Sequence, residues 1–219
     1  VIPGKTPTSL VTGGIFRFSR NPIYLGDVLV LGKLGGALDF SGGVADDLLS
    51  FFHDRLKVFL RDEGIRHDVI DACLAMPGND DLTLLVARAR ALGAVLATED
   101  GENLVQGFKR ANNILTQAET ADGVEYSYGA DRKFAEGATE IALFDALDAA
   151  EAVIAPAMQA EDFAAAMTAM AALRAPIDAF FEAVQVNADS SVVRRNRLNL
   201  LSRIRTTCGQ VADLTRIDG

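Results

Sequence analysis

From Val44 onward, apolar side chains recur every three to four residues, and this spacing constrains the fold more than any other feature of the chain. In the first such segment Leu49, Phe52 and Leu56 fall on one face of a helix, whereas Asp54 falls on the opposite face. Runs of β-branched residues are few, and no segment alternates apolar and polar residues as a half-buried strand does. The sequence therefore predicts an all-α fold, a helical bundle.

Residues that start and stop helices give the expected bounds. Gly64 suits a C-terminal cap, Pro176 suits a first helical turn, and Asp189 and Ser190 are suitable N-caps. We expect a loop over residues 121–130 and helices over about 48–63, 68–75, 82–96, 103–118, 131–155, 160–174, 176–186 and 189–217.

The first forty residues differ in composition from the rest. Residues 1–40 are rich in glycine, contain three prolines and carry more basic than acidic groups. A shift of this kind marks a domain boundary, which we place between residues 39 and 43. The expected organisation is a short N-terminal segment, residues 1–40, followed by a helical domain, residues 44–219.

Charge is unevenly distributed along a chain whose formal net charge is −9. An acidic protein of this kind does not bind nucleic acid through its overall charge, so any such contact needs a local basic patch. Residues 134–173 contain no Lys or Arg, whereas the last predicted helix carries many arginines. These arginines either form a solvated, ion-paired helix face or contact phosphate groups, and the sequence leaves both readings open.

Residues that support catalysis or metal binding are scarce. The only two histidines, in His53-Asp54 and His67-Asp68, cannot supply a complete metal site or a catalytic triad, and the two cysteines lack disulfide or metal-ligand spacing. Cys73 and Cys208 are expected in the core. The most apolar run, residues 23–38, is interrupted by charges, so we expect no stable membrane insertion and a cytoplasmic location.

Several residue strings are distinctive, namely FFHDRL at 51–56, KRANNIL at 109–115, LRAPIDAFF at 173–181 and the Arg/Leu-rich stretch 194–201. They resemble the C-terminal region of bacterial glycyl-tRNA synthetase β subunits, and the resemblance runs in register over about residues 44–219. The closing part is also similar to the helical anticodon-binding domain of arginyl-tRNA synthetases. The resemblance implies that the domain binds the anticodon region of glycine tRNA.

In the family, the synthetase α subunit forms the adenylate and transfers the amino acid. The resemblance therefore implies no catalytic residue and no cofactor or metal site in this chain, with ATP used by the parent glycine–tRNA ligase. It also implies that the α subunit and the rest of the β subunit are partners. A purely structural helical domain that docks on those subunits is an alternative.

Residues 1–38, which include RNPIY at 20–24, resemble membrane phospholipid or isoprenylcysteine methyltransferases. In that family the motif helps to form the S-adenosylmethionine site. The other membrane spans and the distal acidic pair of the family do not follow here. A methyltransferase remnant is thus a second alternative, and we expect no cofactor binding by this segment.

If the tRNA interpretation holds, basic and amide side chains contact phosphates or bases. A glycine anticodon ends in two cytosines, which a protein reads with acceptors for the amino group beside Arg, Lys or Asn. Either Tyr126 or Tyr128 could stack on an unpaired base, or could instead cover the bundle. The candidates for RNA contact are Lys109, Arg110, Asn113, Arg195, Arg203 and Arg205, with Arg55 and Arg132 in addition.

For each of these candidates the alternative is a surface ion pair. Arg197 lies beside the predicted buried stripe of the last helix, so it is expected to have a structural role. Guanidinium groups that are held by neighbouring carboxylates would count against the proposed phosphate contacts.

Overall fold

The computed structural model describes residues 44–218. Residues 1–43, with the methyltransferase-like segment, lie outside the described part of the chain. The chain divides into two compact units, 1–63 and 64–219. The boundary expected between residues 39 and 43 lies outside the described residues. Within the first unit, α2 (Val44–Asp62) is a 19-residue amphipathic helix that buries Leu56 and Leu60.

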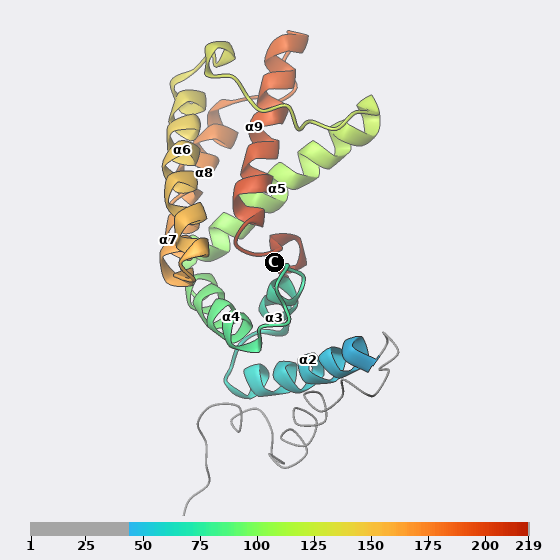
Figure 1. Cartoon of the computed structure of the whole chain (residues 1–219). Helices are drawn as coiled ribbons and strands as arrows, with labels where there is room; N and C mark the ends of the chain where they lie inside the picture. The colour runs from blue at the N-terminus through green and yellow to red at the C-terminus, as the bar shows by residue number, and fades with distance from the viewer. Residues whose placement is uncertain (1–43, 219) are drawn as a thin grey trace, which may run out of the picture. The chain divides into compact units, whose positions relative to one another are not determined.

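The second unit consists of helices in its described residues, 64–218, with no strand among them, which confirms the predicted all-α fold. Its elements are α3 (His67–Leu74), α4 (Leu82–Leu96), α5 (Glu99–Asp122), η2 (Arg132–Phe134), α6 (Ala138–Gln159), α7 (Phe163–Ala171), α8 (Arg174–Ala183), α9 (Ser191–Gly209) and η3 (Leu214–Arg216). Helices α8 and α9 each pack against both α5 and α6, and α7 links α6 to α4 (Figure 1).

The predicted apolar stripe of α9 is buried. Leu200, Ile204 and Cys208 are each no more than 1% exposed, and Cys73 is equally buried on α3. Burial raises the pKa of both thiols to about 12, so at neutral pH they are protonated core groups. This confirms the expected core placement of the two cysteines.

The last helix is shorter than predicted. It begins as expected after its N-cap Ser190 but ends at Gly209 instead of continuing to Ile217. The segment that follows turns back, and the Asp213 amide donates to the carbonyl oxygen of Ala72 in α3 (3.3 Å). The apolar residues Val211, Ala212, Leu214 and Ile217 continue the helical pattern in sequence, but they are buried in the segment around a separate turn, η3, which packs on α3 and α5.

The helix predicted over 131–155 begins later than expected. Asp131 caps the short η2 by accepting from the Lys133 amide (3.0 Å), and α6 itself starts at Ala138. Between α5 and η2 the chain forms the predicted loop, which starts at Gly123 in the left-handed region (φ +66°).

Residues 163–183 meet the length and hydropathy of a membrane-spanning helix. The stretch comprises two helices, α7 and α8, and Met167, Met170, Ile177 and Phe180 are fully buried within it. The apolar character therefore serves the core of the bundle.

Candidate functional site

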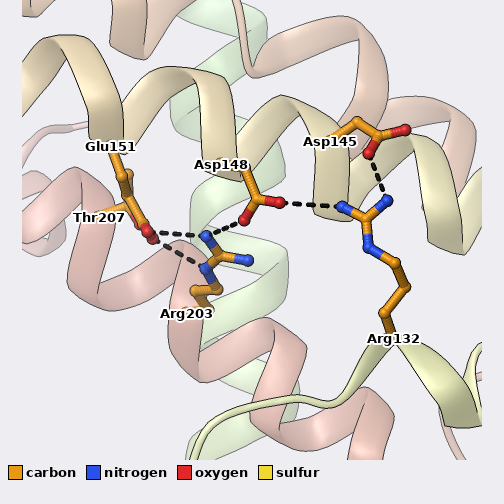
Figure 2. A network of polar contacts seen from close by, with 6 residues as sticks. All are labelled: Arg132, Asp145, Asp148, Glu151, Arg203 and Thr207. Atoms are coloured by element: carbon orange, nitrogen blue, oxygen red, sulfur yellow. Dashed lines mark hydrogen bonds and ion pairs between the residues drawn. The ribbon is translucent and has the colours of Figure 1, made fainter.

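Arg203 of α9 is held by carboxylates of α6. Its Nε and one terminal nitrogen donate to the two oxygens of Glu151 at 2.9 and 2.7 Å, and that nitrogen also contacts Asp148 (Figure 2). The Thr207 hydroxyl donates to Glu151 as well (2.7 Å). The bonds from Arg203 hold the pKa values of Glu151 and Asp148 below their usual range and raise the pKa of Arg203. This cluster fixes α9 onto α6.

Two further candidates are held in the same way. Arg132 of η2 donates to Asp148 (2.9 Å) and to Asp145, so the network continues along α6 (Figure 2). Arg205 makes two parallel bonds of 3.0 Å to Glu119 of α5, which lower the pKa of that carboxyl. The sequence left open whether these arginines project freely or form ion pairs. They form ion pairs.

Two other arginines of α9 also form ion pairs. Arg197 is only 11% exposed and pairs with Glu140 and Glu136, within the stretch 134–173 that contains no Lys or Arg, in agreement with the structural role expected for it. Arg194 donates to Asp122 at the end of α5 (2.8 Å) and to the Tyr126 hydroxyl (3.2 Å). Most of the positive charge of α9 is therefore balanced inside the bundle.

Arg195 is different. Its side chain is exposed, and it makes no hydrogen bond or ion pair within residues 44–218. On α5, Lys109 and Asn113 likewise lack partners among the described residues, and the Arg110 guanidinium lies over the Phe181 ring, 4.5 Å from its centroid.

Arg55 lies on α2, in the other compact unit, with its guanidinium 5.3 Å from the centroid of the Phe51 ring. The candidates on α5 and α9 belong to the second unit.

The loop that follows α5 holds its two tyrosines differently. Tyr126 is 6% exposed, its hydroxyl donates to Asp122 (2.5 Å), and its amide donates to Glu119 (3.3 Å). At the far end of the loop the Asp131 amide donates to Asn196 of α9 (2.8 Å). Tyr128, between these two attachments, is 95% exposed. Tyr126 thus covers the bundle, whereas Tyr128 presents a free ring.

Two open hollows flank Arg195. The first, which we call the loop hollow, has a volume of about 570 Å³ and is lined by residues 124–128 with Arg195 and Asn199. The second, which we call the η2 hollow, has a volume of about 620 Å³ and is lined by Asp122, Val124, Tyr126, Phe134, Ser191, Val192, Arg194 and Arg195. Hollows of this size accommodate a planar ring the size of a nucleobase.

The loop hollow contains polar groups without partners. Asn199 is 7% exposed, and its Oδ1 is buried without a hydrogen-bond partner in the described structure. An acceptor left in this state costs about 1–3 kcal/mol, which a ligand that donates to it would recover. Glu125 and Ser127, on the rim, also make no side-chain hydrogen bond within residues 44–218. Together with Arg195 and Tyr128, they offer an aromatic face, a cation and several acceptors.

Asn199 and Glu125 were not among the candidates from the sequence. The available signal was an amide at position 199 between Leu198 and Leu200 in a predicted core helix. Across the described residues no group of three or more His, Cys, Asp or Glu side chains could hold a metal ion. The aromatic face, the cation and the free acceptors of the loop hollow support recognition of a polar, planar ligand.

Residues 104–218, which contain both hollows, match the family model of the DALR anticodon binding domain. This chain belongs to that family. The DALR domain accounts for every helix from α6 to α9 and for most of α5.

Relatives with longer chains contain the same region. The chain is 80% identical over 174 residues to the glycine–tRNA ligase beta subunit of Dinoroseobacter shibae, which covers 80% of this chain and 24% of that protein. It is 78% identical over 173 residues to the beta subunit of Cereibacter sphaeroides (79% and 25%). It is 42% identical over 208 residues to that of Phenylobacterium zucineum (95% and 31%), an alignment that extends into residues 1–43. The chain thus spans about a quarter of the length of the first two relatives.

Proposed function

We propose that this chain is the tRNA-binding part of a glycyl-tRNA synthetase β subunit and that it recognises the anticodon of glycine tRNA. The observation that carries the proposal is the loop hollow: it lies in a DALR anticodon-binding domain and gathers an unpaired arginine, an exposed tyrosine and an unpaired buried amide oxygen. Relatives named as glycine–tRNA ligase beta subunits, at up to 80% identity among those compared, support the choice of glycine tRNA.

Each group of the site has a physical role in this proposal. Tyr128 stacks on an unpaired base, an interaction worth about 1–3 kcal/mol. Arg195 binds phosphate, and because the other α9 arginines are paired, the acidic protein has little attraction for RNA elsewhere on that helix. Acceptors at Asn199 and Glu125 suit the amino group of cytosine, the base that ends glycine anticodons.

The proposal extends to the assembly in which the domain works. We propose that the synthetase α subunit and the remainder of the β subunit are its partners, that ATP is used elsewhere in that assembly, and that the protein acts in the cytoplasm. The curated relatives, which are three to four times longer than the matched region, support a role as one module of a larger subunit.

Filter binding with the whole 219-residue chain tests the function. We expect glycine tRNA to bind at least about tenfold more tightly than the same tRNA with its anticodon swapped, since each mismatched base costs about 1–3 kcal/mol. Equal binding of the two tRNAs would remove the proposed anticodon recognition.

A pair of variants tests the contribution of the Arg195 guanidinium to tRNA binding. Arg195→Met removes the unpaired guanidinium and should weaken glycine tRNA binding about tenfold. Arg216→Met removes another exposed charge, from η3, where Arg216 pairs with Asp213 (3.0 Å), and should leave binding unchanged. Equal losses in the two variants would show that only net charge matters.

A further inference from the structure

The loop hollow and the η2 hollow have a common wall. Val124, Tyr126 and Arg195 line both of them, so the unpaired guanidinium lies between two spaces of similar volume. A group that binds a phosphate between two base-sized hollows is placed to hold two successive nucleotides of one strand. The arrangement therefore fits two bases and the phosphodiester that joins them.

Each hollow has an exposed aromatic ring at its rim. Tyr128 lines the loop hollow and is 95% exposed, and Phe134 lines the η2 hollow and is 38% exposed. Exposed rings beside a cation are the usual platform for single-stranded RNA, because every base has a face that can stack.

The polar groups of the two hollows differ in whether they already have hydrogen-bond partners in the protein. In the η2 hollow, Asp122, Tyr126 and Arg194 are bonded to one another at 2.5, 2.8 and 3.2 Å. Apart from Arg195, which we place on the phosphate, these bonds engage its charged and phenolic groups, so this hollow has little with which to read the edge of a base.

The loop hollow retains free acceptors. The buried Oδ1 of Asn199 and the carboxylate of Glu125 both lack donors within the described residues. Acceptors select a base edge that carries an amino group, as in cytosine, and disfavour one that carries a carbonyl oxygen at the same position, as in uracil.

We propose that the two hollows bind consecutive nucleotides, with Arg195 on the phosphate between them, and that only the base in the loop hollow is identified. The read base carries an exocyclic amino group, and the base in the η2 hollow is held by stacking whatever its identity. This inference rests on the proposed function in that the ligand is RNA, and it adds which of the two bases is read and by which side chains.

Fluorescence anisotropy with labelled octamers of cytidine and of uridine tests this proposal on the whole chain. The octamers lack the tRNA structure, so their result is independent of the glycine tRNA comparison, and either proposal can fail while the other stands. We expect the cytidine octamer to bind at least about fivefold more tightly than the uridine octamer. Equal affinity of the two octamers overturns the inference.

Two variants separate reading from stacking. Asn199→Leu keeps the side-chain size, removes the buried acceptor and should bring the two affinities to within about twofold of each other. Phe134→Leu should weaken both octamers by the same factor, about threefold to tenfold, and keep their ratio. An unchanged ratio in Asn199→Leu, or a lost ratio in Phe134→Leu, overturns the assignment of the two hollows. Melting curves of both variants confirm that the bundle is folded.

Discussion

Replacing Arg203 by Met should destabilise the bundle without removing its RNA-binding site. The change deletes the two bonds from the guanidinium to Glu151 and the contact with Asp148, while Asp148 keeps Arg132 and Glu151 keeps Thr207. Hydrogen bonds between charged groups contribute about 1.5–3 kcal/mol when well shielded. The side chains of Arg203 and Glu151 are 22% and 35% exposed, so solvent screening reduces the expected loss to about 1–2 kcal/mol.

A loss of this size is measurable in a thermal melt. For a domain of this length each kcal/mol shifts Tm by about 2–4 °C, so Arg203→Met should lower Tm by about 2–8 °C. Arg195→Met is the matched control on the same helix: with no partner to lose, it should change stability by no more than about 0.5 kcal/mol. The reasoning fails if Arg203→Met melts within about 1 °C of the parent protein, or if the control loses as much.

The destabilisation caused by Arg203→Met should depend on pH. Because the folded protein lowers the pKa of Glu151 and Asp148, their contribution is fully present above the ordinary carboxyl pKa of about 4. It disappears as the pH falls through the lowered folded-state values and both groups become protonated. The Tm difference between the parent protein and Arg203→Met should therefore be constant from pH 6 to 8 and shrink below about pH 4. A difference that grows on acidification would contradict the assigned sign.

Three further outcomes follow from particular residues. A Cβ at Gly101 would lie 2.1 Å from a backbone oxygen near the end of α4, so Gly101→Ala should lower Tm clearly, whereas Gly209→Ala, with open space around it, should leave Tm unchanged or raise it. Cys73 and Cys208, with pKa values of about 12, should react with a thiol reagent at pH 8 only in denaturant, and rapid labelling of the native protein would contradict their burial. Lys109→Ala should reduce the slope of log affinity against log salt for glycine tRNA by about 0.7 if Lys109 contacts a phosphate, and an unchanged slope would exclude that contact.

Helical periodicity was sufficient to predict the all-α class and the place of most helices. The bounds of α4 are those expected from the spacing of its apolar residues, and the buried stripe of α9 includes Leu200, Ile204 and Cys208 as predicted. Where α9 ends could not be predicted from that pattern, because Val211, Leu214 and Ile217 have a helical spacing and are buried whether the chain continues the helix or turns back onto α3.

The state of each arginine depends on contacts that are distant in sequence. Arg195, Arg203 and Arg205 belong to one helix and have the same chemistry, but Arg203 faces carboxylates 52 and 55 positions away and Arg205 faces one 86 positions away. Arg195 faces a hollow instead. Local spacing cannot distinguish these cases, since the partner is decided by how α9 packs on α5 and α6.

The attachment of the 123–131 loop has a consequence for binding affinity. Bonds at Tyr126 and at Asp131 fix the chain on both sides of Tyr128, so the backbone that carries the ring is preorganised and an incoming ligand spends less entropy on ordering the loop. Asn196 of α9 holds the Asp131 amide and thereby limits the mobility of Tyr128, three positions earlier in the chain. Asn196 therefore influences the binding affinity. An RNA strand bound at Tyr128 would dissociate faster when the Asn196 side chain is removed, although none of the contacts between RNA and protein would have changed.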